Sequence, residues 1–463
     1  MNVLFVFASI GNLPAYENVI RELCKRGHRV IIHHGQTTKK YFTDHSLQAI
    51  KSEFGELCDD GSLLIRKHWR GLLGFTRQLL NRTPYLSPLH PSPWLINRNT
   101  GFAPFTQRIL DLKPMVMMLK SKKVQEFIRG VESRIPSDPS IKQWLQQNRP
   151  DIVIGSPCIY ARQDEMEYLR AANELGIPTI VSIFSWDHLL TKGTLHVLPD
   201  WLMVWNQNLA DDAVTLHSMP KDRIFLTGAP HFDVWFEKTP TLDYGAFCNR
   251  VGLDPDRKYI AYLCSAVRGD ESTLVHEFAD ALSADPETRD LSVLVRPYPS
   301  KSDIWDNFEK KNVVIWPKKG SIPNSSSEKD DYYHTIYHSL AVAGISTTAF
   351  VESAVIDKPC LVIMTDQYSY EHRMGHFLYL LDADFLEIAR DVNDFTSILH
   401  RIMQGEDAKA AQRDLFVTQF TRPWGKHLRA SQIMAEAIEL VAQNGTLNEF
   451  SPQGNSWNGV KIK

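Results

Sequence analysis

Continuous apolar runs alternate with segments of helical periodicity along most of this chain. Residues 2–8, NVLFVFA, are apolar without interruption, which is typical of a parallel strand that is buried on both faces. Residues 14–26 follow with apolar side chains at helical spacing, and Gly27 then precedes a second apolar run, RVIIHH, at 29–34. A strand, a helix, a glycine and a strand form a βαβ unit, so the pattern predicts the start of a Rossmann-like domain.

The same alternation continues through the second half of the chain and predicts an α/β protein with two such domains. Further strands are expected at 151–156, 178–184, 201–206, 223–228, 259–265, 291–299, 313–317 and 359–364, and helices near 164–175, 207–217 and 271–283. The composition of IPNSSSEKDD, residues 322–331, predicts a surface loop.

A break at Gly228-Ala229-Pro230 separates the two halves. We expect four parts: an N-terminal Rossmann-like domain at 1–230, a C-terminal Rossmann-like domain at 231–425, a helix at 426–443 and a loose tail at 444–463.

Residues 341–363, AVAGISTTAFVESAVIDKPCLVI, carry the densest pattern of candidate binding residues. Gly344 permits a turn that a Cβ would hinder. Three hydroxyl residues follow where a helix begins: Ser346, Thr347 and Thr348. A helix N-terminus presents unpaired N–H groups and a partial positive charge, which suit a phosphate, and Glu352 one turn further in could reach the hydroxyls of a ribose. The same pattern also fits an ordinary strand–helix–strand unit with Ser and Thr at the cap.

Composition and charge exclude several classes of function. The chain has 463 residues, of which 43% are hydrophobic and 23% charged, as in a globular protein with real cores. A formal net charge of −3 argues against a nucleic-acid-binding protein. The six cysteines are scattered without a C-x-x-C pair, which favours a reducing compartment and no structural zinc. The N-terminus lacks a basic n-region and no apolar run approaches about 18 residues, so the sequence predicts a cytoplasmic protein.

Residues 61–130 depart from this charge balance. They hold 12 Lys and Arg residues against two acids, Asp111 and Glu126. The segment RKHWRGLLGFTRQLLNR, at 66–82, interleaves these cations with aromatic and aliphatic residues, as in a basic amphipathic surface that meets an anionic membrane or lipid-linked phosphates. The alternative is a solvated helical insertion whose apolar side packs on the domain.

A second group of candidates follows the expected strand at 178–184. The loop SWDHLLTKG holds four of them: Trp186, Asp187, His188 and Lys192. Open α/β sheets bind ligands at the carboxyl ends of their strands, which is where this loop begins. Asp187 is the preferred candidate for a general base, with His188 the weaker candidate, and capping of the next turn is the alternative role of Asp187.

Two Rossmann-like halves, a Gly-x-Pro linker and a final helix resemble the GT-B glycosyltransferases over most of residues 1–443. RIFLTGAPHFD, at 223–233, looks like the segment at the family's domain junction, and GISTTAFVESAVIDKP, at 344–359, resembles its donor-nucleotide motif. SWDHLLTKG is similar to a group of bacterial surface-polysaccharide transferases. The resemblance implies two domains that face a central cleft, with the C-terminal helix crossing back to the first domain. It makes 1–230 the acceptor-binding domain and 231–425 the nucleotide-sugar-binding domain. It also implies that Asn12, Trp186 and Lys192 lie on the acceptor side.

The resemblance also implies the donor contacts. It places phosphate at the helix start after Gly344, ribose at Glu352, and the hydroxyls of the donor sugar at Asp366 and Gln367. Two arginines follow strands of the second domain and could stabilise the diphosphate as bidentate donors, or could instead form structural ion pairs. They are Arg268 and Arg296.

The function implied is transfer of a sugar from a nucleotide-diphosphate donor to a glycan or lipid-linked acceptor in bacterial surface-polysaccharide synthesis. Gly344 stands where retaining members with paired glutamates need an acid, which favours inversion. No Asp-x-Asp motif stands in a suitable loop, so we expect no metal, and no cofactor besides the nucleotide-sugar co-substrate.

Departures from the family pattern keep three alternatives open. Asn12 stands where many GT-B members carry a catalytic histidine, which keeps a non-catalytic nucleotide-sugar-binding protein in view. CSAVRGDES, at 264–272, stands where UDP-N-acetylglucosamine 2-epimerases have an H-R-x-E-N sequence. This difference argues against an epimerase-like enzyme, which is the second alternative. RPYP, at 296–299, resembles the R-P-H-P of capsule and teichoic-type transferases with Tyr298 in place of histidine, so a polyol-phosphate transferase stays open.

Overall fold

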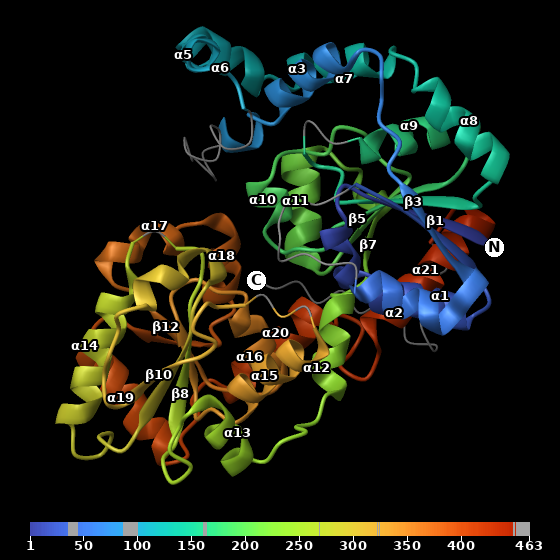
Figure 1. Ribbon diagram of the computed structural model, residues 1–463. Coiled ribbons are helices and arrows are strands. Elements are labelled where there is room, and N and C mark those ends of the chain that lie inside the picture. Colours follow the sequence, from blue (N-terminus) through green and yellow to red (C-terminus); the bar gives the residue numbers. More distant parts are fainter. Residues whose placement is uncertain are drawn as a thin grey trace. The chain divides into compact units, whose positions relative to one another are not determined.

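The computed structural model describes residues 1–35, 45–86, 101–160, 164–267, 269–321, 323, 325–447 and 450. The chain divides into two compact units (Figure 1). Unit 1 comprises Met1–Asp233 and Gln419–Lys463, and unit 2 comprises Val234–Thr418. Each unit is built on its own parallel sheet, with seven described strands in unit 1 and six in unit 2. The predicted α/β class with two Rossmann-like domains is therefore confirmed.

The sheet of unit 1 is parallel throughout, in the order β3-β2-β1-β4-β5-β6-β7. In the middle of the sheet, Val3 of β1 lies opposite Val30 of β2 and Ile152 of β4. The apolar run of β1 is fully buried, as a strand with helices on both faces requires. The strands are β1 (Asn2–Phe7), β2 (Arg29–His34), β3 (Cys58–Ser62), β4 (Ile152–Ser156), β5 (Thr179–Ser182), β6 (Trp201–Val204) and β7 (Ile224–Leu226).

Helices cover both faces of this sheet. On one face, α1 (Glu17–Lys25), α2 (His45–Phe54) and α21 (Ala430–Asn444) share an apolar core with alternate side chains of β1. α9 (Glu165–Leu175) packs on β1, β4 and β5, and α8 (Pro139–Asn148) packs on α9. The shorter α10 (His188–Thr191) contacts α11 (Gln207–His217).

The C-terminal helix α21 lies in unit 1, as expected for a helix that crosses back to the first domain. Glu439 of α21 accepts a hydrogen bond from Arg26 at 2.9 Å and pairs with His28 at 2.6 Å. The buried carboxylate of Asp233 accepts hydrogen bonds from Arg422 and from the first backbone N–H groups of α21. Gly228 is required beside this junction, because a Cβ there would lie 2.5 Å from the carbonyl oxygen of Thr421.

The basic segment of unit 1 is helical. Its described helices are α3 (Arg70–Leu80), α5 (Pro104–Leu110), α6 (Lys113–Lys120) and α7 (Lys122–Ser133). Leu80, Leu110, Leu119 and Ile128 form a small apolar core between them. In the described part of the chain, no helix has the length and apolarity needed to cross a bilayer.

The sheet of unit 2 is also parallel, in the order β10-β9-β8-β11-β12-β13. The strands are β8 (Tyr259–Leu263), β9 (Ser292–Arg296), β10 (Val313–Ile315), β11 (Val342–Gly344), β12 (Cys360–Ile363) and β13 (Leu386–Ala389). α14 (Glu271–Ala284) and α19 (Val392–Met403) cover one face, where the rings of Phe278 and Phe395 lie 4.3 Å apart. The other helices are α12 (Asp233–Glu237), α13 (Tyr244–Val251), α15 (Ser326–Tyr337), α16 (Ala349–Val355), α17 (Ser369–His372), α18 (Gly375–Asp382) and α20 (Ala410–Thr421), of which α12 and α20 cross the boundary between the units.

The structure differs from the sequence prediction in three elements. α15 begins inside the loop expected at 322–331, because Ser325 and Glu328 form a reciprocal capping box: each backbone N–H donates to the other's side chain, at 3.0 and 3.3 Å. β3, with the sequence CDDGS, and β13, with LEIA, are edge strands that lack the long apolar run of a central strand. Most of the tail expected at 444–463 lies outside the described residues.

Candidate functional site

Polar side chains gather at the carboxyl edge of the unit 2 sheet. Because the strands are parallel, the residues that follow β8, β9, β11 and β12 lie along the same edge. Most of the donor residues expected from the sequence follow one of these four strands. Arg268, one of the two expected arginines, lies outside the described residues.

Arg296 is the last residue of β9 and is almost fully buried. Its Nη2 donates to Ser321 Oγ at 2.9 Å, and its guanidinium carbon lies 5.0 Å from the ring centroid of Tyr332. Its Nη1 has no hydrogen-bond partner among the described residues, and no carboxylate there forms an ion pair with it. Burial lowers the pKa of Arg296, while Tyr332 and the nearby acids of α15 act in the opposite direction. An anion at this edge would satisfy both the charge and the free N–H groups.

Tyr332 of α15 connects Arg296 to Glu352 of α16. Its hydroxyl donates to Glu352 Oε2 at 3.4 Å, and its ring faces the Arg296 guanidinium. Glu352 is half-buried, and burial raises the pKa of its carboxyl from 4.5 to about 8, although the hydrogen bond from Tyr332 lowers it. Arg296, Tyr332 and Glu352 therefore form a continuous polar chain across the edge.

The turn after β11 is compact because Gly344 has no side chain. A Cβ at Gly344 would lie 2.9 Å from the carbonyl oxygen of Leu263, the last residue of β8. At the start of α16, the Oγ1 of Thr347 accepts a hydrogen bond from the N–H of Ala349 at 3.2 Å, whereas the side chain of Thr348 makes no capping bond. Ser346 and Thr347 are half-buried and Thr348 is exposed.

The pair Asp366-Gln367 is exposed on the 3₁₀ turn that follows β12 (Asp366–Tyr368). The turn is held in place by Tyr368, which is buried and whose hydroxyl donates to the carbonyl oxygen of Asp270 at 3.1 Å. The two side chains expected to meet the donor's hydroxyls therefore project from a fixed turn at the carboxyl edge of the sheet.

The sequence analysis missed four polar residues at this edge. Ser265 Oγ, Thr365 Oγ1 and His372 Nε2 are buried and have no hydrogen-bond partner among the described residues. Burial lowers the pKa of His372, which keeps its imidazole neutral. Glu271 is buried, accepts a hydrogen bond from the Tyr262 hydroxyl at 3.0 Å, and has a pKa raised to about 7 by burial. Ser265 and Thr365 lie just after apolar strands, so their position in the sequence could have predicted them. Nothing in the sequence around His372 predicts its place at this edge.

The loop after β5 holds the candidate residues of unit 1. Asp187 is half-buried; its Oδ1 accepts from Ser185 Oγ at 2.5 Å, and its Oδ2 accepts from Thr191 at 2.9 Å and pairs with Lys192 at 3.2 Å. His188 is buried against Phe184, and burial lowers its pKa to about 4, so the imidazole is neutral at pH 7.

Two residues expected on the acceptor side make contacts within unit 1. Trp186 is buried, with its ring edge-on to Phe420 at 6.0 Å. The amide of Asn12, in the 3₁₀ turn Ile10–Ala15, donates to the carbonyl oxygen of Ser156 at the end of β4 at 3.4 Å. Both positions follow strand ends, and both contacts hold neighbouring segments of unit 1 together.

The basic segment needs a correction, because three of its arginines are structural. Arg66, Arg77 and Arg82 are buried and paired with acids, so they are not part of an open cationic surface. Arg77 donates to Glu132 and Glu167 at 2.6 and 2.7 Å, and Arg66 pairs with the other oxygen of Glu167. The exposed cations of the described segment are instead Lys67, Arg70, Arg108, Lys113, Lys120, Lys122 and Lys123.

Solved structures that are similar over almost the whole chain identify the fold. UDP-GlcNAc 2-epimerase from Methanocaldococcus jannaschii matches with a TM-score of 0.53 and 11% sequence identity, over 95% of this chain and 99% of that one. The Neisseria meningitidis UDP-GlcNAc 2-epimerase bound to UDP-GlcNAc matches with a TM-score of 0.50 and 13% identity, over 95% and 100%. The chain has the GT-B fold. At these identities the likeness concerns the GT-B fold alone, and a search of curated protein sequences found no match.

A family model adds a transferase relationship to the GT-B fold. The model of the CDP-glycerol:poly(glycerophosphate) glycerophosphotransferase family matches residues 198–425, which include β8 to β13 and the whole carboxyl edge described above. The resemblance to GT-B transferases is thus supported. The family match indicates a glycosyl or glycerophosphate transferase. In the described part of the chain, no three His, Cys, Asp or Glu side chains are grouped as metal ligands would be.

The raised pKa of Glu352 predicts a pH-dependent stability. A carboxyl whose pKa rises from 4.5 to about 8 on folding stabilises the folded state fully below pH 4.5, and this contribution is lost as the pH rises toward 8. Glu352→Gln should therefore unfold like the wild type near pH 4 and be more stable than the wild type above pH 8, by at least about 1 kcal/mol, since one pKa unit corresponds to about 1.4 kcal/mol. Thermal unfolding from pH 4 to pH 9 measures the difference. The exposed Glu287 of the same unit provides the control variant Glu287→Gln, and parallel profiles for Glu352→Gln and wild type would contradict the assignment.

Proposed function

We propose that unit 2 binds the nucleoside diphosphate part of an activated donor and that the protein transfers the donor's glycosyl group to an acceptor held by unit 1. The observation that carries this proposal is the buried Arg296, whose guanidinium has a free N–H group and no carboxylate partner among the described residues. A buried cation without a matching anion is costly, and a diphosphate would supply the anion. Two GT-B structures similar to this one contain UDP-GlcNAc or UDP, which supports a nucleotide ligand.

The remaining edge residues have roles in this proposal. The diphosphate lies at Arg296 and the hydroxyls of Ser346 and Thr347, the ribose at Glu352, and the transferred group at Asp366 and Gln367. In the transfer, the acceptor oxygen attacks the anomeric carbon, the bond from that carbon to the phosphate oxygen breaks, and the nucleoside diphosphate leaves with the electron pair. The acceptor's proton passes to a general base, for which we propose Asp187, and Arg296 stabilises the negative charge on the leaving group.

The family match favours a second candidate, transfer of glycerophosphate from a CDP-linked donor. In that reaction the acceptor oxygen attacks phosphorus and the bond between the two phosphates breaks, so the phosphate moves with the glycerol and CMP leaves. Chromatography of the nucleotide products therefore separates the candidates. Glycosyl transfer yields a nucleoside diphosphate, glycerophosphate transfer yields a monophosphate, and a 2-epimerase would return an intact nucleotide sugar.

Arg296→Gln should weaken binding of CDP and UDP by roughly tenfold to a hundredfold, because a hydrogen bond to a charged group contributes about 1.5–3 kcal/mol. Isothermal calorimetry with both nucleotides measures the change. Arg401→Gln removes another arginine of unit 2, a half-exposed one paired with Glu387 at 3.1 Å, and should leave affinity unchanged. Equal affinities for Arg296→Gln and wild type would show that the nucleotide lies elsewhere.

Asp187→Asn should reduce turnover by about a hundredfold to ten-thousandfold while nucleotide affinity stays at the wild-type value, because a general base acts in the transition state. Lys192→Met removes the ion-pair partner of Asp187 but leaves the carboxylate, and it should cost less than tenfold. Rates are measured with the donor that the product analysis identifies. A similar loss in both variants would make the pair structural and would remove Asp187 from the mechanism.

A further inference from the structure

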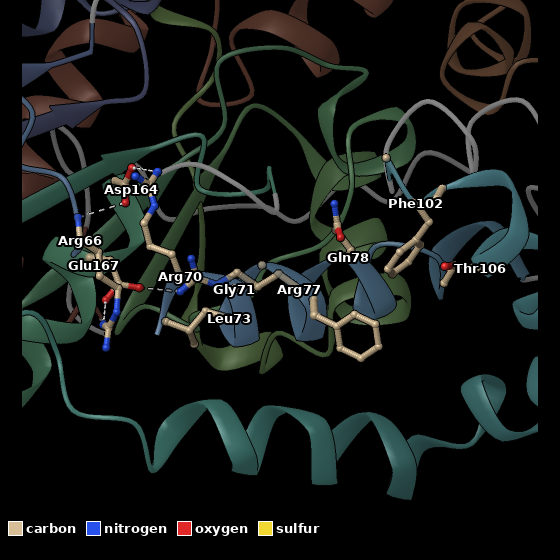
Figure 2. A pocket seen from close by; sticks show the side chains of 14 residues that line it. Arg66, Arg70, Gly71, Leu73, Arg77, Gln78, Phe102, Thr106, Asp164 and Glu167 are labelled. Carbon is tan, nitrogen blue, oxygen red and sulfur yellow. Dashed lines mark hydrogen bonds and ion pairs between the residues drawn. The ribbon is translucent and has the colours of Figure 1, made fainter. Parts of the chain in front are cut away.

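The basic segment of unit 1 contains a pocket that the nucleotide proposal does not use. Its volume is about 500 Å³, and it lies between α3, the segment 101–106 and the first turn of α9. Figure 2 shows Arg66, Arg70 and Asp164 toward one end of α3, and Phe102 and Thr106 toward the other. The pocket therefore has a charged end and an end with apolar side chains.

Three residues on one face of α3 keep this pocket open and polar. Gly71, Gly74 and Gln78 follow the i, i+3, i+7 spacing of a single helical face, and all three line the pocket. A Cβ on either glycine would meet no atom of the described residues within 4 Å, so those residues leave the space above both glycines open. Glycine is the least favourable residue in a helix after proline, so the pair does not serve the helix itself.

Gln78 indicates that this space accommodates a polar ligand. Its side chain is only 6% exposed and lines the pocket. An amide both donates and accepts hydrogen bonds, so this side chain can pair with polar groups of a ligand in the pocket. The open space above the glycines lies on the same helical face.

The charges around the pocket select an anion. Four arginines, Arg66, Arg70, Arg77 and Arg170, are connected by ion pairs to three acids, Glu132, Asp164 and Glu167, which leaves a surplus of one positive charge (4 − 3). The side chain of Arg70 is 52% exposed and is held at the pocket by Asp164 at 3.0 Å. Its remaining guanidinium N–H groups can meet a phosphate, to which arginine geometry is suited.

The surface next to the pocket selects a ligand with a long apolar part. Ten of the sixteen exposed large apolar side chains of the described residues lie in this one segment. They are Ile65, Trp69, Leu72, Phe75, Phe105, Ile109, Leu112, Met117, Met118 and Phe127. Phe75 also lines the apolar end of the pocket, edge-on to Phe102 at 5.8 Å. Exposed apolar side chains interspersed with exposed lysines and arginines are typical of a surface that enters the interface of an anionic membrane.

We propose that this pocket binds the phosphate-bearing head of a lipid, with the hydrocarbon part lying against the exposed apolar side chains of α3 and α5. The phosphate meets Arg70 at the charged end, and the polar groups next to it donate to and accept from the amide of Gln78. This inference deepens the proposed function by making the acceptor a phosphorylated lipid. The acceptor role of the lipid rests on the proposed function, whereas lipid binding by the pocket does not.

Flotation with vesicles tests the pocket directly. The wild-type chain should bind vesicles that contain phosphatidylglycerol at least tenfold more tightly than phosphatidylcholine vesicles, and the preference should weaken as salt rises. Gly71→Leu combined with Gly74→Leu should weaken binding to the anionic vesicles at least tenfold, because the added side chains extend into the pocket from positions where a Cβ meets no atom of the described residues within 4 Å. Adsorption through apolar surface alone predicts the opposite change, since two leucines are added.

The matched control is Gly130→Leu in α7, where an added Cβ also meets nothing within 4 Å and which does not line the pocket; it should bind as the wild type does. Gln78→Leu keeps the size of the side chain, removes its amide, and should weaken binding severalfold even if the double variant folds poorly. Thermal midpoints confirm folding.

Three results would overturn the proposal: equal binding to both kinds of vesicle, unchanged or stronger binding by the double variant, or displacement by millimolar glycerol phosphate, which would make the ligand a soluble phosphate. Calorimetry with CDP and UDP on the same variants keeps the two proposals distinguishable. Normal nucleotide affinity with lost vesicle binding is expected, whereas absence of nucleotide binding in the wild type would refute the proposed function and leave the vesicle result standing.

Discussion

The close approach of β11 to β8 is the constraint on which the unit 2 site depends. The Cα of Gly344 lies so near the carbonyl oxygen of Leu263 that any Cβ would come within 2.9 Å of it. With no side chain in the way, the strand ends converge, and the turn through Ser346 and Thr347 begins directly at the edge where β9 ends on Arg296. The polar chain from Arg296 through Tyr332 to Glu352 then spans this edge.

The two units treat buried arginines in opposite ways. In unit 1, Arg66 and Arg77 are matched by Glu167 and Glu132, so the charges offset one another and hold α3, α7 and α9 together. In unit 2, Arg296 is equally buried but has only a serine hydroxyl and an aromatic ring as partners in the described part of the chain. Because removing one member of a buried ion pair is strongly destabilising, we infer a structural role for Arg66 and Arg77. For Arg296, which has no such partner among the described residues, we infer that a ligand supplies the negative charge.

Much of the fold could be predicted from the sequence, because long apolar runs fix central parallel strands. Residues 29–34 and 207–217 form the elements that their patterns predict, with the same bounds. The edge strands β3 and β13 were not predicted, because an edge strand needs no long apolar run. The start of α15 was not predicted, because the polar composition of 322–331 indicated a loop although Ser325 begins a capping box. For the site, Arg296 and Glu352 could be predicted because they lie at the end of a strand and in the helix that follows one. His372 could not be predicted, because only tertiary packing places it at this edge. Nor could charge counting show that Arg66 and Arg77 are buried, since their acidic partners Glu132 and Glu167 lie beyond the basic segment.

The central claim is that a nucleoside diphosphate binds at the carboxyl edge of the unit 2 sheet. Hydrogen–deuterium exchange of the full chain, with and without saturating CDP or UDP, tests it most directly. The account predicts slower exchange in the segments that follow the four strands, at 264–267, 297–299, 345–352 and 365–372, with exchange in 66–82 unchanged. Slower exchange confined to unit 1, or no change in these four segments while calorimetry shows the nucleotide bound, would contradict it.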